Sequence, residues 1–249
     1  MRGSLTLWRT ILLPLGMAGL CAVMVIWSGR WGLAEFYTFP IEKLSTKLHD
    51  PKVSFEEKES AWQQAVHYNR QALSLHPGNA EYWLQLGQLH YVWSRQIKED
   101  IERSASLLAE AASNYEMAAN IRPTWGYTWI NLAQVRMVQG RERWGEAVTD
   151  LERAMVLAPW EPTVQQNVVR LGFILWSVLE DRLQNDVLNV AVRAMQSSPY
   201  PILELVQRYG KREQIQHLVR RHARLRIEFD KYFETISQGA DRSVDGRQR

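Results

Sequence analysis

Small apolar residues recur along the chain at intervals of about one and two helical turns, and a proline closes each set. The shared pattern is alanine, a bulky or polar residue four positions later, alanine three positions after that, and proline five further on. Three sets follow it: Ala65, Asn69, Ala72 and Pro77; Ala111, Tyr115, Ala118 and Pro123; Ala147, Leu151, Ala154 and Pro159. Residues at these intervals share one stripe of a helix, where alanine lets a second helix approach closely. Each helix should end before its proline, which cannot donate the next backbone hydrogen bond.

A second motif follows two of these prolines at the same offset. It consists of a tryptophan, then a leucine and a small residue: Trp83, Leu86 and Gly87 after Pro77, and Trp129, Leu132 and Ala133 after Pro123. The bulky residues would fill the space that the facing alanines leave. No alternation typical of strands occurs between turn signals, so we predict an all-α chain of antiparallel helix pairs.

These motifs together resemble the tetratricopeptide (TPR) repeat. The resemblance implies an α-solenoid that holds other proteins. A longer interval between His90 and Ala111 predicts a lengthened helical hairpin through residues 97–108. A fourth, degraded copy fits Val168, Leu171, Gly172, Val187, Ala191, Ala194 and Pro199, so we expect about three to four helix pairs.

The N-terminal segment, residues 1–30, has a different pattern. Residues 11–27 carry no charge and lie between Arg9 and Arg30. As a helix they would be about 26 Å long, slightly short of a hydrocarbon core of about 30 Å. Trp8, Trp27 and Trp31 suit the membrane interface, so we predict a transmembrane helix over residues 11–27. The alternative is a cleaved secretory signal ending near Gly32-Leu33-Ala34, which Arg30 and Trp31 disfavour.

Charges that flank this segment predict its orientation. Arg2 and Arg9 precede it, and Arg30 and the more distant Lys43 follow. The positive-inside rule then places the N-terminus in the cytoplasm. For a bacterial inner-membrane protein, the C-terminal repeat domain would lie in the periplasm.

Turn and charge signals divide the rest of the chain. Residues 31–53 are predicted to be a juxtamembrane linker broken at Asp50-Pro51, and repeats fill residues 54–198 from a capping box at Ser54 and Glu57. A C-terminal helical cap over residues 199–238 includes one basic helix from Lys211, with Arg212, Arg220, Arg221, Arg224 and Arg226. This helix is either an ordinary solvated face or a binder of an anionic ligand. The polar residues 239–249 are expected to be disordered.

The family resemblance also implies where partners bind. The groove of TPR proteins is lined by the first helix of each pair, and its positions carry over to Glu81, Leu84, Gln88, Tyr91, Tyr127, Ile130, Gln134 and Met137. This surface lacks the Lys and Asn with which some members hold a terminal carboxylate. An apolar helix or extended segment is the better candidate ligand. The competing interpretation is that the apolar members pack against neighbouring helices.

The sequence contains no motif that is typical of a catalytic site. The chain lacks a phosphate-binding glycine loop, a nucleophile elbow, an H-E-x-x-H motif and cysteine pairs, and its six histidines are scattered. We therefore expect no enzymatic activity, cofactor or metal. The net charge is only +3, so the chain lacks the strong positive charge that is typical of nucleic-acid binding. The expected partners are proteins of the membrane or envelope, and the lipid bilayer through residues 11–27.

Two function classes remain. The first is a membrane-anchored scaffold or assembly factor, and the second is an accessory subunit of a larger membrane complex. The layout of a single span, Gly32 to Tyr37 and Trp62 to Ala65 resembles that of bitopic TPR proteins of bacterial exopolysaccharide biosynthesis clusters. That resemblance implies support of polymer synthesis or export. Cytochrome c maturation and chaperoning at the translocation machinery are alternatives.

Overall fold

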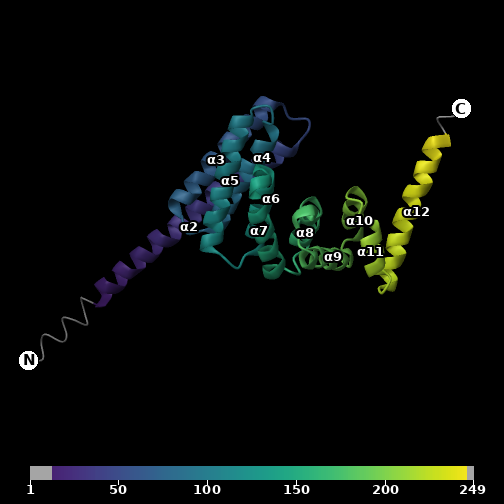
Figure 1. The fold of residues 1–249 in the computed structure, drawn as a ribbon. Coiled ribbons are helices and arrows are strands. Elements are labelled where there is room, and N and C mark those ends of the chain that lie inside the picture. The colour runs from purple at the N-terminus through teal and green to yellow at the C-terminus, as the bar shows by residue number, and fades with distance from the viewer. Residues whose placement is uncertain (1–12, 246–249) are drawn as a thin grey trace, which may run out of the picture. The chain divides into compact units, whose positions relative to one another are not determined.

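The computed structural model describes residues 13–245, with side chains over residues 14–236. Eleven α-helices, two short 3-10 helices and no strand occupy this part of the chain (Figure 1). Their bounds are α2 Leu13–His49, α3 Phe55–Leu75, α4 Ala80–Gln96, α5 Ile101–Ile121, α6 Gly126–Gln139, η2 Arg141–Arg143, α7 Trp144–Leu157, α8 Pro162–Ile174, η3 Trp176–Val178, α9 Asp181–Met195, α10 Pro199–Arg208, α11 Arg212–Val219 and α12 Ala223–Asp245. The all-α prediction is confirmed.

The chain divides into two compact units, with the boundary between Ile121 and Arg122. Unit 1 holds α2 to α5, and unit 2 holds α6 to α12. In unit 1 the helix pairs are α2 with α3 and α4 with α5, and in unit 2 they begin with α6 and α7, then α8 and α9. The expected number of helix pairs is therefore present.

Helix α2 corrects the predicted linker over residues 31–53. It runs without a break through Pro40 to His49, and only the predicted stop at Asp50-Pro51 holds. Buried Ala34, Ile41, Leu44 and Leu48 recur at helical spacing and pack in the core of unit 1. Burial of this stripe outweighs the low helix propensity of Pro40, because tertiary packing supplies most of the stability of a helix.

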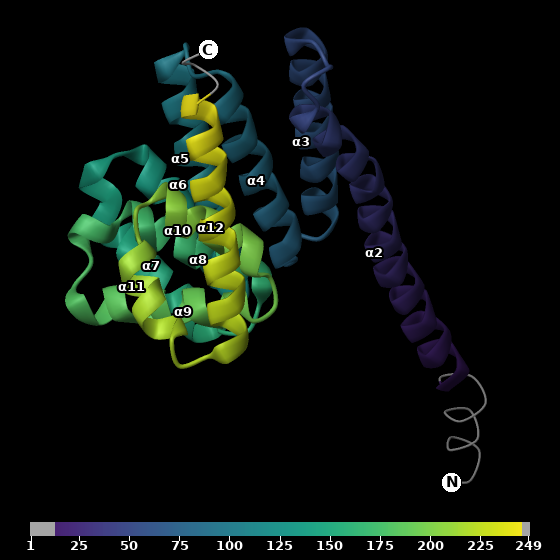
Figure 2. The same cartoon turned by 90° about the vertical axis from the view of Figure 1, so that its right-hand side faces the viewer.

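The first half of α2 projects beyond the other helices of unit 1 (Figures 1 and 2). Residues 14–33 are exposed without exception. Within the described residues, α2 is the one helix long and apolar enough to cross a membrane, with a mean hydropathy of 1.3 in its most apolar window. The helix continues past Trp27, where the predicted span ended. The start of that span at Ile11, together with Arg2, Trp8 and Arg9, lies outside the described residues.

Capping confirms where the first helix after α2 begins. The Ser54 side chain accepts a hydrogen bond from the Glu57 backbone N–H at 3.2 Å, and Glu57 Oε2 accepts one from the Ser54 N–H at 3.3 Å. This reciprocal pair satisfies two backbone donors that a helix start leaves unpaired. Helix α3 accordingly starts at Phe55.

The repeated alanines lie in the interior of the structure. The six alanines of the three sets, Ala65, Ala72, Ala111, Ala118, Ala147 and Ala154, are all fully buried. The small residue of the preceding helix is equally constrained. A Cβ added to Gly87 would lie 2.6 Å from the Tyr115 ring. Small residues are thus required on both helices of that pair because their backbones approach closely.

A hydrogen bond repeats after each of the three prolines. The side chain six residues beyond the proline donates to the proline carbonyl: Trp83 Nε1 to Pro77 O at 2.8 Å, Trp129 Nε1 to Pro123 O at 2.8 Å, and Gln165 Nε2 to Pro159 O at 2.7 Å. Gln165 shows that the third turn has the same geometry without a tryptophan. Its donor amide takes the place of the indole N–H.

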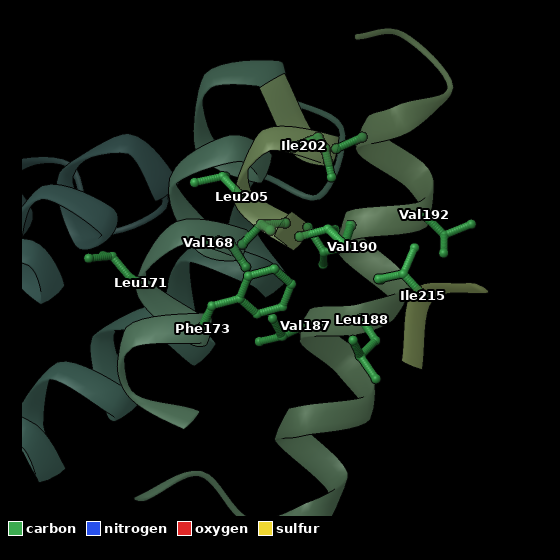
Figure 3. Packing of buried hydrophobic residues seen from close by; sticks show 14 of the residues in the cluster. Val168, Leu171, Phe173, Val187, Leu188, Val190, Val192, Ile202, Leu205 and Ile215 are labelled. Carbon is green, nitrogen blue, oxygen red and sulfur yellow. The ribbon is translucent and has the colours of Figure 1, made fainter. Parts of the chain in front are cut away.

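The core of unit 2 is continuous from α6 to α12, and Figure 3 shows its central part. Val168 and Phe173 of α8 lie close to Val187 and Val190 of α9, while Leu171 points to the other side of α8. A Cβ added to Gly172 would lie 2.6 Å from Val187 Cγ2. Helices α8 and α9 therefore form the degraded fourth pair, with the short helix η3 between them.

Replacing Gly172 by alanine is expected to destabilise unit 2 by about 1–3 kcal/mol, since fully buried, β-branched Val187 has little freedom to move aside. Gly145→Ala is the matched control in the same unit. No atom lies within 4 Å of its added Cβ, so stability should be unchanged or rise by up to about 1 kcal/mol. Thermal unfolding of both variants measures the difference, and equal midpoints would contradict the close approach of α8 and α9.

The C-terminal region corrects two predictions. The single basic helix from Lys211 is two helices, α11 and α12, separated by a turn at Arg220–His222. Val219 and Leu225 both face the core but would point about 120° apart on an uninterrupted helix, and the change of direction between them lets both pack there. The tail expected to be disordered from Gly239 continues α12 to Asp245, because no proline interrupts it. Residues 246–249 lie outside the described residues.

Candidate protein-binding surfaces

The first helices of the two pairs in unit 1 enclose a shallow hollow of about 300 Å³, the α2–α4 groove. Its lining residues are Ile41, Glu42, Ser45, Thr46 and His49 of α2, with Gln85, Gln88, Leu89 and Val92 of α4. Buried Ile41 and Leu89 form an apolar floor, while exposed Glu42 and Thr46 stand at its edge. Such a surface suits a peptide segment that offers both apolar side chains and hydrogen-bonding groups.

A buried polar contact positions one groove residue. Asn69 of α3 is fully buried, and its Nδ2 donates to Gln85 Oε1 at 2.8 Å. This bond fixes the amide plane of Gln85 and leaves its N–H groups to serve a ligand. Asn69 was identified in the sequence only as the polar member of the first repeat set, so its link to the groove depends on the third dimension.

The predicted groove residues of α4 occupy several environments. Gln88 lines the α2–α4 groove, Glu81 is exposed, Tyr91 is half-buried and Leu84 is buried. The α2 residues of the groove were missed, because residues 31–53 were predicted to be a linker. Helical spacing of apolar Ala34, Ile41, Leu44 and Leu48 was the signal that could have identified them.

The predicted groove residues of α6 make contacts within unit 2. Ile130 is buried in the core of unit 2, and Tyr127 and Met137 pack against that core. Gln134 Oε1 accepts a hydrogen bond from Arg170 Nη2 at 2.8 Å. For Ile130, packing within the fold accounts for the apolar side chain.

Unit 2 has two further hollows at the turns that precede α6 and α8. One, of about 460 Å³, is lined by Pro123, Trp129, Thr149, Glu152, Arg153, Val156 and Leu157, and the other, of about 580 Å³, by residues 124–127 and 157–161. Trp160 and Val156 are 74% and 73% exposed. Neither residue is needed for the core, so this aromatic surface is a second candidate for contact with a protein.

A charged cluster joins α6 to α7 inside unit 2. Arg136 Nη1 donates to Asp150 Oδ2 at 2.6 Å, and Arg136 Nε lies 3.3 Å from Glu146 Oε2. Asp150 is fully buried. Burial raises the pKa of the Asp150 carboxyl to about 6, which the attraction of Arg136 opposes but does not cancel.

This pKa makes the stability of unit 2 depend on pH. The folded carboxyl binds its proton more tightly than the unfolded one, whose pKa is 3.8. Its contribution to stability is therefore complete below about pH 3.8 and is lost as the pH rises through about 6. Asp150→Asn, which does not titrate, should remove this fall between pH 4 and 6. Urea unfolding of both chains across that range measures it, and parallel profiles would contradict the raised pKa.

Metal binding and acid–base catalysis both need titratable side chains close together, and the described residues hold few such groups. No group of three or more His, Cys, Asp or Glu side chains there could hold a metal ion. The nearest approach to an acid–base pair is His90 Nε2, 3.5 Å from Glu110 Oε2. Burial lowers the pKa of His90, which favours the neutral imidazole. Arg70 Nη2 lies 3.9 Å from the same Glu110 oxygen, so the carboxylate is shared between the two side chains.

Comparison with known proteins bears on the fold. No family model and no curated protein matches the sequence. Among solved structures, the chain is similar to that of the human IFIT1 dimer with PPP-AAAA, with a TM-score of 0.51 and 18% identity, over 75% of this chain and 46% of that chain. It is also similar to TTC0263, a thermophilic TPR protein of Thermus thermophilus, with a TM-score of 0.49 and 18% identity, over 74% and 97%. The fold of the described residues is a TPR-like array of helix pairs.

Proposed function

We propose that this chain is a membrane-anchored scaffold whose helix pairs hold other proteins close to the bilayer. The observation that carries the proposal is the double use of α2. Its exposed residues 14–33 would extend about 30 Å as a helix, which is the thickness of a hydrocarbon core. The second half of the same helix builds unit 1. Anchor and repeats are thus one continuous element.

Three contacts hold the junction of anchor and repeats. Arg30 Nη2 donates to Leu75 O at the end of α3 at 3.1 Å, and the Trp31 ring lies 4.7 Å from that of His76. Tyr82 Oη donates to Glu35 Oε1 at 2.7 Å, and burial, reinforced by Glu35, raises the pKa of Tyr82 to about 12. A cation at a helix C-terminus is favourable because the carbonyl ends carry partial negative charge.

This rigid junction sets the height of the α2–α4 groove above the membrane. Ile41 and His49 lie on α2 about 12 and 24 Å beyond Leu33, at about 1.5 Å per residue. A segment of another membrane protein that leaves the bilayer beside α2 would meet the groove at once. Confinement to the same surface also raises the effective concentration of such a partner, so weak contacts suffice.

We further propose that the partners are envelope proteins and that the process is exopolysaccharide synthesis or export. The layout of the chain, a single span followed directly by repeats, supports this choice. With the N-terminus in the cytoplasm, the repeats work in the periplasm of a bacterial cell. A reporter enzyme fused after Arg249 that is active only in the cytosol would overturn this orientation, and normal surface polysaccharide after deletion would overturn the process.

In-cell photocrosslinking tests the scaffold function directly. A photoreactive residue at Gln88 or Thr46, both exposed in the groove, should form an adduct with an integral membrane protein. The same residue at Gln63, exposed on α3 outside the groove lining, is the control. Ser45→Trp fills the groove and should abolish the Gln88 adduct while the chain stays in the membrane. Equal labelling at Gln88 and Gln63 would refute the groove as the binding site.

Size analysis after extraction separates the scaffold from an obligate subunit. A scaffold leaves the membrane in mild detergent as a monomer or small oligomer. Permanent recovery in one large complex would instead favour an accessory subunit of a membrane enzyme or transporter.

A further inference from the structure

The turn between α11 and α12 gathers positive charge on the surface of unit 2. Arg220, Arg221, Arg224 and Arg226 are all exposed, and no acidic residue occurs between Glu213 and Glu228. The four guanidinium groups form no ion pair or hydrogen bond with any side chain that the structure describes. We call residues 220–226 the arginine turn. Concentrated unpaired charge of one sign is a surface that attracts anions.

The two other basic residues of this region serve the fold. Lys211 Nζ lies 3.7 Å from the centre of the Trp176 ring, and the Arg212 guanidinium 4.6 Å from that of Phe233. Burial lowers the pKa of Lys211. Cation–π contacts of this kind stabilise packing. Lys211 and Arg212 thus contribute to packing, whereas the four exposed arginines make no such contact.

An exposed apolar side chain lies next to the arginine turn. Ile227 is 62% exposed, because Leu225 and Phe229 on the same helix face the core. Two residues along a helix differ by about 200° in direction, so Ile227 points away from the surface that α12 buries. Arginines beside an outward apolar residue are typical of segments that lie in the headgroup layer of a membrane.

We propose that the arginine turn and Ile227 bind the surface of a bilayer that contains anionic phospholipids. The proposal rests on the anchoring proposed above, because α2 would tether unit 2 to the same membrane. Guanidinium groups donate two hydrogen bonds to a phosphate, and Ile227 enters the interface between them. A single-stranded nucleic acid is the weaker occupant, since residues 220–227 hold no Phe, Tyr or Trp on which bases could stack.

A fluorescent label at the turn tests the proposal in the full-length chain. Cys21 is the only cysteine, so a Cys21→Ala, Ile227→Cys chain takes one environment-sensitive bimane label. The chain is reconstituted into phosphatidylcholine vesicles with or without phosphatidylglycerol. We expect a blue shift of the emission in the anionic vesicles alone. It should reverse in about 1 M salt, where the Debye length falls to about 3 Å.

Two charge variants decide whether the arginines are responsible. Exchanging Arg220, Arg221, Arg224 and Arg226 for glutamine should abolish the shift. A control variant has the same exchange at four exposed residues of unit 1: Lys47, Lys52, Arg95 and Lys98. It changes the net charge by the same amount and should keep the emission shift. A label at Gln166, exposed on α8, should not shift. Identical emission in both vesicle types, or equal loss in both variants, would overturn the proposal.

Other outcomes are also decisive. A shift caused by a single-stranded RNA oligonucleotide in neutral vesicles, stronger than that caused by anionic lipid, would assign the turn to nucleic acid instead. A chain that fails to float with neutral vesicles would contradict the anchor. In that case the labelled chain is mixed with preformed vesicles, and a shift with the anionic ones alone would support the arginine turn without α2.

Discussion

Arginine at both Val23 and Ile26 is expected to move the chain from the membrane to the soluble fraction. The two residues lie near the middle of the exposed stretch of α2 and are 61% and 64% exposed. An arginine at the centre of a membrane helix costs about 2.5–3.5 kcal/mol on insertion scales. Two together lower the insertion equilibrium by about four to five orders of magnitude.

Membrane fractionation with an alkaline wash measures this effect. Gln63→Arg with Gln64→Arg adds the same charges to exposed positions of α3 and should leave the chain in the membrane. Retention of the Val23 and Ile26 variant in the washed membranes would contradict a span through residues 14–33. Mass analysis of the wild-type N-terminus separates the alternative of a cleaved signal, because a mature chain that starts near Ala34 would lack the helix.

Trp93→Ala should have the largest effect on the stability of unit 1, a loss of about 3–5 kcal/mol. Trp93 is fully buried and stacks on Trp62, with ring centres 5.4 Å apart and 13° between the planes. The centre of the Phe55 ring lies 5.3 Å from that of Trp93. Removing the indole leaves a cavity among three helices that cannot close without moving the stack.

A conservative variant refines this prediction. The Trp93 indole N–H is buried without a hydrogen-bond partner among the described residues. Trp93→Phe gives up area but also removes that unpaired donor, so its cost should be clearly smaller than that of alanine. Trp160→Ala, at a site 74% exposed on unit 2, should change stability by less than about 1 kcal/mol. Urea unfolding compares the three, and equal losses at Trp93 and Trp160 would contradict the buried stack.

The groove shows where local patterns stop being informative. Gln88 was assigned through the TPR resemblance, which implies groove positions on the helix that holds Trp83. Its neighbours Glu42, Ser45 and Thr46 belong to a helix that Pro40 and a run of aromatic residues obscured. Their placement depends on α3 and α4, against which α2 packs. The free energy that Pro40 costs the helix is offset by contacts with residues distant in the sequence, and no local pattern reveals those contacts.

The sequence by itself determined the helix pairs, their closing prolines and the Ser54 cap, because these depend on spacing within one or two turns. It also located the apolar stretch that α2 exposes. Tertiary structure decided that α2 is shared by that stretch and the first repeat pair. It decided too that the basic region bends at Arg220–His222 and that Gln165 takes over a tryptophan's hydrogen bond. Each of these depends on contacts between segments far apart in the chain, whose free energy outweighs local preference.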